Sequence, residues 1–515
     1  MALVIAGRVV PMTCDPTVAA DTSASFRGRV WIGDDGMITA VTRSRQPGPA
    51  GFDTAPVVDV GTSLVLPGLI DLHNHLAYNT LPLWSEPTQR TPFAHHDSWT
   101  RARSYAASVT WPAHAFVTAA PQELLAYAET KAIIGGTTSV QGSPPKNRPR
   151  DGWLVRNVED ETWGTRNRNL VYASTLTMTP TALAERANRM RAGSLFIYHC
   201  AEGQPGTIAA AEFRDAAAAG CLQPRFVAVH CNAVDPTVFT EWTEQGAVVW
   251  SPLSNLWLYG TTTDVPAARN AGVPVCLGSD WAPSGSKHIL GELKVARIVA
   301  DHHGWTLSDR ELVTMVTADP GDVLARSWGR QTGRLQPYAA ADVTIIRAAR
   351  NADPFTTVVH ATERDVQLVI VNGQPRYGTP ALMRRSGAQP VTDLTVAGQR
   401  RLLSLTRPDD PTQAWPWQEV LARLEQVRAN PKREIERGQA RLAAFNGPFD
   451  DPAAPLRLAL DMPTGIAPVG GLPKDLTQIL IPPLDTLTHD DAFLASLVGR
   501  GWHGGVLHKL ADYYR

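Results

Sequence analysis

Eight short apolar runs, separated by segments of helical character, leave this chain few folds to choose from. They occupy residues 64–72, 137–142, 154–158, 170–177, 194–199, 225–230, 247–252 and 274–279. Between the first two runs, the segment PQELLAYAETKAII has the apolar spacing of a helix. Strands that alternate with helices form parallel sheets, and eight such units make a TIM-type barrel. The sequence therefore predicts an α/β fold with a (β/α)8 barrel over residues 61–330.

Short strands separated by Gly, Asp and Pro turns flank the predicted barrel on both sides. We expect residues 1–60 and 331–390 to pair into one small β-sandwich domain. Residues 80–118, rich in Trp, Pro and His, follow the first barrel strand, so this insertion should lie over the barrel mouth and the pocket. Residues 391–515 are predicted to form a mostly helical C-terminal extension.

Composition and charge limit the partners of the chain. A hydrophobic content of 43%, 19% charged residues and a net charge of −1 give no electrostatic preference for nucleic acid or an anionic membrane. The N-terminal apolar stretch is too short for a secretory signal, and no window reaches the ~18 apolar residues of a membrane span. The five cysteines form no CxxC pair, which argues against a disulfide framework. We expect a cytoplasmic protein that acts on a small molecule, binds no nucleic acid or membrane, and is either monomeric or a homo-oligomer.

Polar side chains close four of the predicted strands. They are His73 and His75 after the first strand, His199 and Glu202 after the fifth, His230 after the sixth, and Asp280 after the eighth. Residues i and i+2 of a strand point to one face, so His73 and His75 project side by side. The C-terminal strand ends of a barrel share one rim, where active sites lie. We therefore expect these imidazoles and carboxylates to meet at one site.

The ordered motifs PGLIDLHNH, HCAE, AVH, SPLSN and GSD resemble the metal-dependent amidohydrolase superfamily, in particular its mononuclear cytosine-deaminase-like and triazine-hydrolase-like branch. The resemblance covers about residues 1–385 and implies one divalent ion per chain, bound by His73, His75, His199 and Asp280. Three neutral imidazoles and a carboxylate suit Zn²⁺ first, with Fe²⁺ or Mn²⁺ as alternatives. Related enzymes with two metals use a carboxylated lysine after the fourth strand, and residues 169–180 contain no lysine.

The same resemblance implies roles for three residues. Glu202, in the HxxE pattern with His199, is the expected proton shuttle between the attacking water and the leaving nitrogen. His230 is expected to hydrogen-bond the water or the developing oxyanion, and Asp280 to act as ligand and second base. Candidate substrate contacts, for which simple packing is the alternative, are Asn79, Trp84, Asn255 and Trp281.

The expected activity is hydrolysis of a C–N bond in an amide, a cyclic amide or an amino-heterocycle by metal-activated water. Two alternatives remain open at this point. One is a deaminase restricted to small aminoheterocycles, and the other is a non-catalytic metal-binding barrel protein.

Overall fold

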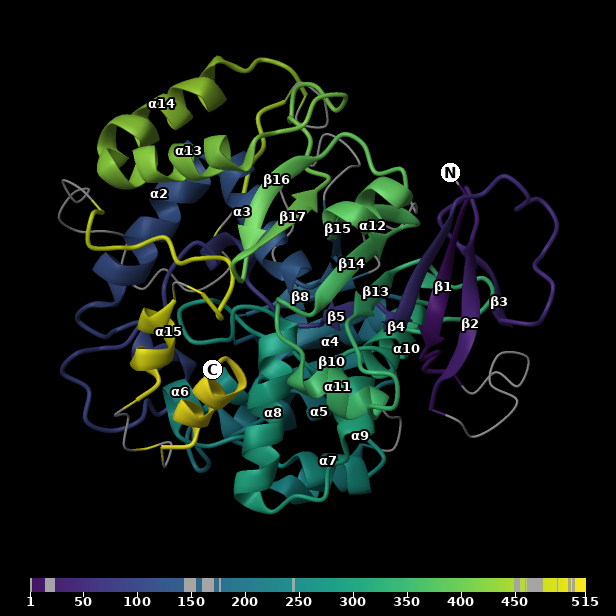
Figure 1. The fold of residues 1–515 in the computed structure, drawn as a ribbon. Coiled ribbons are helices and arrows are strands. Elements are labelled where there is room, and N and C mark those ends of the chain that lie inside the picture. The colour runs from purple at the N-terminus through teal and green to yellow at the C-terminus, as the bar shows by residue number, and fades with distance from the viewer. Residues whose placement is uncertain are drawn as a thin grey trace.

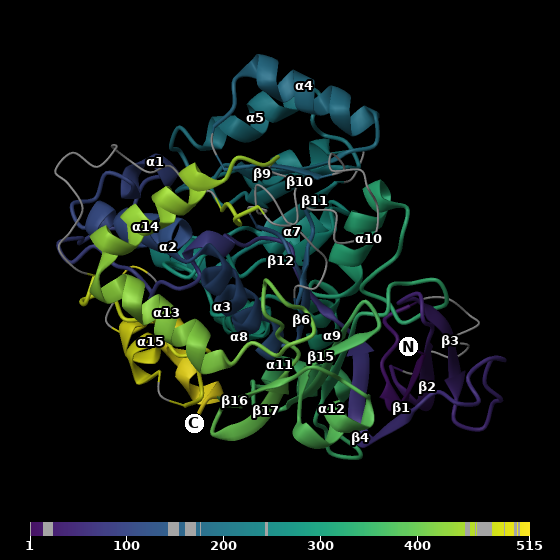
Figure 2. The same cartoon turned by 90° about the horizontal axis from the view of Figure 1, so that it is seen from above.

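The computed structural model describes residues 2–13, 24–142, 154–159, 171–175, 177–242, 246–448, 454–458, 460, 476–488, 490–498, 502 and 505–515. Eight short strands lie at the centre of the molecule, one within each predicted run (Figure 2). They are β5 (Leu69–Asp71), β6 (Thr137–Val140), β7 (Arg156–Asn157), β8 (Val171–Ser174), β9 (Leu195–Cys200), β10 (Phe226–His230), β11 (Ala247–Trp250) and β12 (Val275–Leu277).

The eight strands pair in parallel as two arcs, β5-β6-β7 and β8-β9-β10-β11-β12. Two backbone hydrogen bonds connect the ends of the arcs, from Leu72 N to Leu277 O (3.4 Å) and from Asp280 N to His73 O (3.0 Å). Among the described residues no ladder joins β7 to β8. The strand order is that of the expected barrel, and full closure of the barrel stays a prediction.

Helices surround the two arcs, and apolar side chains fill the space inside them. The helices are α3 (Pro121–Ile134), α4 (Pro180–Arg191), α5 (Ala210–Ala218), α6 (Pro252–Tyr259), α7 (Val265–Asn270), α8 (Ile289–His303), α9 (Asp309–Thr314) and α10 (Ala318–Trp328). Ile70, Ile197, Val227 and Val249 belong to one fully buried cluster contributed by four different strands. Because this core is packed with aliphatic side chains, polar chemistry is left to the strand ends.

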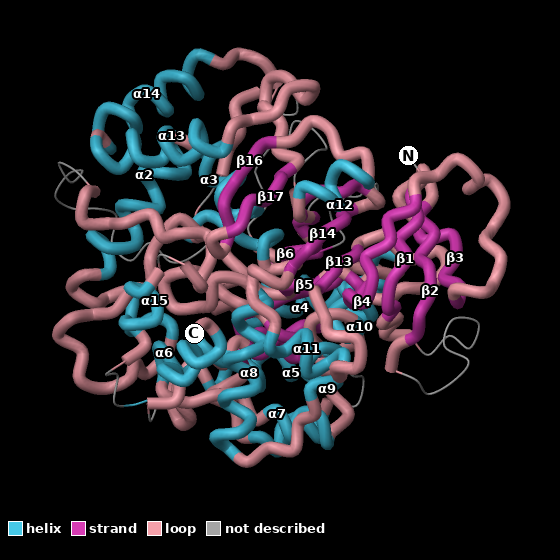
Figure 3. The backbone as a smooth tube through the Cα atoms, viewed as in Figure 1, coloured by secondary structure: helices cyan, strands magenta, loops and turns pink. Residues whose placement is uncertain are grey.

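The two flanks of the barrel form one nine-stranded sheet, so the prediction of a two-sheet sandwich was wrong. The order is β16-β17-β15-β14-β13-β4-β1-β2-β3 (Figure 3). The strands are β1 (Leu3–Val9), β2 (Phe26–Ile32), β3 (Ile38–Arg43), β4 (Val57–Pro67), β13 (Val343–Ile346), β14 (Val366–Val371), β15 (Gln374–Gly378), β16 (Thr392–Val396) and β17 (Gln399–Leu403).

The long strand β4 explains the single sheet. Its 11 residues pair in parallel with β1 on one side and antiparallel with β13 on the other, which joins the N-terminal flank to the C-terminal one. The sheet also continues through β16 and β17, beyond the boundary predicted at residue 390. The extension therefore begins with two strands before it becomes helical.

A buried ion pair connects the sheet to the barrel. Arg156 on β7 donates from Nε to Asp342 Oδ2 at 2.9 Å and from Nη2 to Asp342 Oδ1 at 3.3 Å. Nη2 of Arg156 also donates to Asn372 Oδ1 at 2.8 Å. Buried charges persist only when they are paired and hydrogen-bonded, so this contact fixes how β7 meets the sheet.

The C-terminal extension packs along the insertion side of the barrel (Figure 1). Its helices are α13 (Trp417–Ala429), α14 (Pro431–Ala444), α15 (Asp491–Ser496) and the 3-10 helix η5 (Leu507–Tyr513). The guanidinium groups of Arg423 and Arg441 both donate to the carbonyl oxygen of Ala119, at the end of α2 (Trp111–Ala119). A Cβ at Gly438 would lie 2.1 Å from Thr118 O, so glycine permits this close approach of α14 to α2. Within the described part of the chain, no helix has the length and apolarity needed to cross a membrane.

Candidate metal centre

Four imidazoles and one carboxylate converge at the C-terminal ends of the strands. His73 Nε2 and His75 Nε2 lie 3.2 Å and 3.4 Å from Asp280 Oδ1. His199 Nε2 lies 3.3 Å from His75 Nε2, and His230 Nε2 lies 4.0 Å from Asp280 Oδ2. All five side chains are buried. The structure therefore brings together the residues that the sequence motifs singled out, from β9, β10 and the segments after β5 and β12.

The opposite ring nitrogens of three histidines are held by carbonyl oxygens. His73 Nδ1 lies 3.3 Å from Gln141 Oε1, His199 Nδ1 lies 3.1 Å from the carbonyl oxygen of Ser174, and His230 Nδ1 lies 2.9 Å from Asn255 Oδ1. Because an oxygen acceptor at Nδ1 requires the proton there, the lone pair of a neutral ring sits on Nε2. Three Nε2 lone pairs consequently face the same small volume, which is how histidine ligands of a metal are oriented.

The donor set fits a divalent cation. His73 Nε2 and His230 Nε2 are buried and make no hydrogen bond in the structure, although an unsatisfied buried polar atom is costly. Burial lowers the pKa of His73 and lowers that of His199 well below its ordinary value, which keeps both rings neutral. Burial raises the pKa of Asp280, but the surrounding imidazoles, His73 first, bring it well below the usual range. Neutral nitrogens and a carboxylate around one point are a ligand set for Zn²⁺ or a similar ion.

Two of these residues have unusual backbone conformations. His230 and Asp280 have φ values of +69° and +58°, in the left-handed region that non-glycine residues seldom adopt. Ala201 and Cys231, beside His199 and His230, have φ values of +56° and +53°. Strained backbone of this kind clusters at functional sites, where the surrounding structure compensates its cost.

Glu202 lies at the edge of the histidine cluster. Its Oε2 is 3.7 Å from His230 Nε2, and its Oε1 accepts a hydrogen bond from the Tyr259 hydroxyl at 2.6 Å. Tyr259 in turn accepts from Trp99 Nε1 at 2.8 Å. Burial and the negative charge of Glu202 raise the pKa of Tyr259 well above its ordinary value, so the phenol keeps its proton. One oxygen of Glu202 is thus held by the phenol while the other faces His230.

The insertion at 80–118 supports this edge of the site. Its helical segments are α1 (His96–Trp99) and residues Ala106–Thr110, which lead into α2. His95 forms an isolated antiparallel bridge with Gly203, and His96 N donates to the carbonyl oxygen of Glu202 at 3.2 Å. Trp99 on α1 reaches Tyr259, as described above. The insertion therefore packs against the same strand ends that carry the histidines.

Asn255 and Trp281, two of the four predicted substrate contacts, adjoin the cluster. Asn255 faces His230 Nδ1, and its amide nitrogen donates to Thr263 Oγ1 at 3.1 Å. Trp281 N donates to Asp280 Oδ1 at 2.7 Å, and the indole nitrogen donates to Ser284 Oγ at 2.6 Å. These bonds orient His230 and Asp280, whereas contact of either residue with a substrate stays a prediction.

Asn79 and Trp84, the other two, use their polar groups within the protein. Asn79 Nδ2 donates to Asn74 Oδ1 at 2.8 Å. The Trp84 indole donates to Ser104 Oγ at 3.0 Å and stacks on Phe93 with a centroid distance of 6.0 Å. Both side chains are buried, so the packing alternative describes these contacts, and their role toward a substrate also stays a prediction.

Sequence reasoning missed several residues that support the site. Gln141 directly follows β6, which is the same polar-residue-after-strand signal that identified the histidines. Tyr259, on α6, carries no local signal. His96, which the sequence assigned to surface or packing, is buried and lies 3.0 Å from Glu212 Oε1. Burial lowers the pKa of His96, but the hydrogen bond to Glu212 and nearby carboxylates raise it to about 9.

Removal of the Gln141 acceptor should weaken metal binding without abolishing it. In Gln141→Leu, His73 loses its Nδ1 partner, and we expect roughly 10–100-fold lower metal affinity. Competition with a chelating dye measures this affinity. Gln223→Leu is the matched control, since Gln223 contacts only Ala187 O and Gly220 O ahead of β10. Equal affinities for both variants would remove Gln141 from the metal site.

Comparison with known proteins places this geometry in a family. The model of the amidohydrolase family matches residues 64–376. A 5-methylthioadenosine/S-adenosylhomocysteine deaminase of Symbiobacterium thermophilum is 34% identical over 165 residues, which is 29% of this chain and 37% of the relative. The chain thus matches well under half of the length of that curated relative.

Two solved structures share the fold. Guanine deaminase of E. coli has a TM-score of 0.55 at 16% identity, covering 73% of this chain and 98% of that one. A mutant atrazine chlorohydrolase from Arthrobacter aurescens, complexed with zinc and atraton, has a TM-score of 0.54 at 17% identity, covering 72% and 94%. The family match spans more than half of the chain and includes every histidine of the cluster. This chain belongs to the amidohydrolase family.

Proposed function

We propose that this chain is a hydrolase that uses one bound divalent ion, Zn²⁺ first, to cleave the exocyclic C–N bond of an aminoheterocycle. The observation that carries the proposal is the convergence of His73, His75, His199 and Asp280 around one buried point, with Glu202 and His230 at its edge. His73, His75, His199 and Asp280 would hold the ion. When bound, the ion supplies a Lewis acid that lowers the pKa of a water molecule toward ~7.

Residues of the chain supply the proton transfers. The free carboxylate oxygen of Glu202, opposite the one held by Tyr259, accepts a proton from the attacking water and returns it to the leaving nitrogen. His230, with Nδ1 held by Asn255, directs Nε2 toward Glu202 and Asp280 and stabilises the charge that develops on the attacked carbon's substituents. Asp280 acts as ligand and as a second base.

The surroundings favour a flat substrate. Tyr78, on the 3-10 helix η1 (Leu76–Tyr78), contacts His75 at a ring-centroid distance of 6.5 Å and Trp281 at 5.3 Å. Trp99 lies 5.2 Å from Trp281. This aromatic layer beside the metal site suits a planar ring system. The deaminase names of the relatives agree with this choice over a linear amide.

A substrate panel tests the proposal. We expect metal-loaded protein to release ammonia from at least one member of a panel of 5-methylthioadenosine, S-adenosylhomocysteine, adenosine, guanine, cytosine and aminotriazines. Hydantoin and N-acyl amino acids serve as the comparison, because they present an amide without an exocyclic amine. Turnover of the amides alone would replace deamination with amide hydrolysis. Metal binding without turnover of any compound would favour the non-catalytic alternative.

A further inference from the structure

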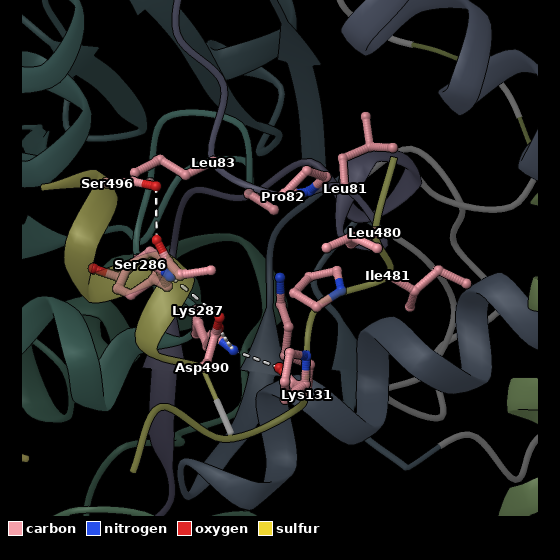
Figure 4. A pocket seen from close by; sticks show the side chains of 16 residues that line it. Leu81, Pro82, Leu83, Lys131, Ser286, Lys287, Leu480, Ile481, Asp490 and Ser496 are labelled. Carbon is pink, nitrogen blue, oxygen red and sulfur yellow. Dashed lines mark hydrogen bonds and ion pairs between the residues drawn. The ribbon is translucent and has the colours of Figure 1, made fainter. Parts of the chain in front are cut away.

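A cavity of about 250 Å³ lies where the C-terminal extension meets the barrel (Figure 4). Three stretches far apart in the sequence line it: the insertion at 81–83, the loop at 282–287 that follows β12, and the extension at 480–496. Lys131 on α3 lines it as well. The residues of the metal centre are not among its lining residues.

The wall of this cavity, here called the seam cavity, is largely apolar. Leu81 and Pro82 come from the insertion, whereas Leu480, Ile481 and Phe493 come from the extension. The Leu480 side chain is 63% exposed, so it lies where the cavity meets solvent. A wall of this kind takes a hydrocarbon or aryl group.

Two lysines and one aspartate line the seam cavity, and they differ in how their charges are met. Lys287 Nζ forms an ion pair with Asp490 and donates to the carbonyl oxygen of Asp485 at 2.9 Å. Lys131 Nζ donates to Asn79 O at 3.0 Å and lies 3.5 Å from Asn79 Oδ1. Among the described residues no carboxylate lies within ion-pair distance of Lys131, although its side chain is only 2% exposed.

An ammonium has three donors, and the contacts of Lys131 go to the oxygens of a single residue. In Figure 4 the amine extends toward Pro82 and Leu480, into the cavity. A buried cation without a counter-charge is costly, and burial accordingly lowers the pKa of Lys131 to about 7, with a further contribution from Lys287. The cavity therefore has an apolar wall and one positive charge that the protein leaves uncompensated.

We propose that the seam cavity is a second ligand site, which binds a small amphipathic monocarboxylate with its carboxylate on Lys131 and its hydrocarbon part against Leu81, Leu480 and Phe493. The charge of the lining residues selects a monoanion, since Lys287 and Asp490 neutralise one another and Lys131 remains. An apolar cavity of ~150 Å³ binds benzene, so about 250 Å³ suits a ligand of roughly ten non-hydrogen atoms. Octanoate has this size and chemistry.

Binding of octanoate to full-length, metal-loaded protein tests the site by isothermal titration calorimetry. We expect saturable binding of octanoate, and at least tenfold weaker binding of 1-octanol and of octylamine, which lack the negative charge. Lys131→Met keeps the length and the apolar contacts of the side chain and should weaken octanoate at least tenfold. Lys432→Met, on exposed α14, is the matched control and should leave binding unchanged.

Two further variants keep the test independent of folding and of the metal. Leu480→Asp changes an exposed residue, so it should fold normally, and its charge at the cavity mouth should weaken octanoate at least tenfold. His199→Ala, which disrupts the metal centre, should still bind octanoate as the wild type does, because the seam cavity lies elsewhere. Loss of binding in His199→Ala would assign the carboxylate to the metal and overturn the proposal. Absence of saturable binding, or unchanged binding in Lys131→Met, would overturn it too.

Discussion

His199→Ala is expected to remove the bound metal ion and, with it, essentially all turnover. His199 contributes one of the nitrogens that meet at the cluster, 3.3 Å from His75 Nε2, and its loss leaves three ligands at most around the ion. Structural and catalytic zinc sites need three or four protein ligands, so affinity should fall by several orders of magnitude. Elemental analysis after dialysis should give about one ion per chain for the wild type and close to none for the variant.

The exposed His302 supplies the control. His302→Ala should keep the full metal content, since that residue lies at the end of α8 and away from the strand ends. Full retention of metal by His199→Ala would refute the ligand assignment. Activity that requires two ions per chain would refute the mononuclear site.

Glu202→Gln should separate proton transfer from metal binding. The amide keeps the shape of the carboxylate and can still accept from Tyr259, but it provides no base. Turnover should fall at least ~10²-fold, the range expected for a general acid-base. Because the shuttle acts in the transition state, kcat should fall more than substrate affinity. Steady-state kinetics on the best substrate of the panel, with metal content measured in parallel, decides the outcome.

Glu185→Gln is the matched control, because Glu185 is exposed on α4 and pairs only with Arg189 in the printed contacts of the structure. It should retain wild-type kcat and metal. If Glu202→Gln keeps most of its activity with the metal in place, proton transfer belongs to Asp280 or His230 instead.

The strands and the clustered histidines were predictable because both signals are local. A buried parallel strand is an apolar run, and a polar residue that ends such a run lies at the C-terminal rim whatever the rest of the chain does. His199 and Asp280 are separated by about 80 residues in the sequence and still meet, since β9 and β12 belong to one parallel arc. The same rule applied to Gln141 would have found the partner of His73.

The single sheet and the contacts around the site were not predictable in this way. Whether β4 joins two sheets or one depends on its pairing with β13, some 280 residues later, and sequence patterns do not encode register between distant strands. Tyr259 and Glu212 carry their roles only through tertiary contacts with Glu202 and His96. The lysine of the seam cavity likewise gains its meaning from an extension that the family match does not include.

The oxygens that hold three of the imidazole rings also affect how fast and how selectively the site takes up an ion. Gln141, the carbonyl of Ser174 and Asn255 fix ring rotation before any ion arrives. The rotamer entropy of those side chains is thus lost during folding rather than on association. A site prepared in this way has little reorganisation to undergo, so ions that demand another coordination geometry gain nothing from its adaptability. Exchange of one metal for another should then be limited by dissociation of the first ion, with no slow conformational phase.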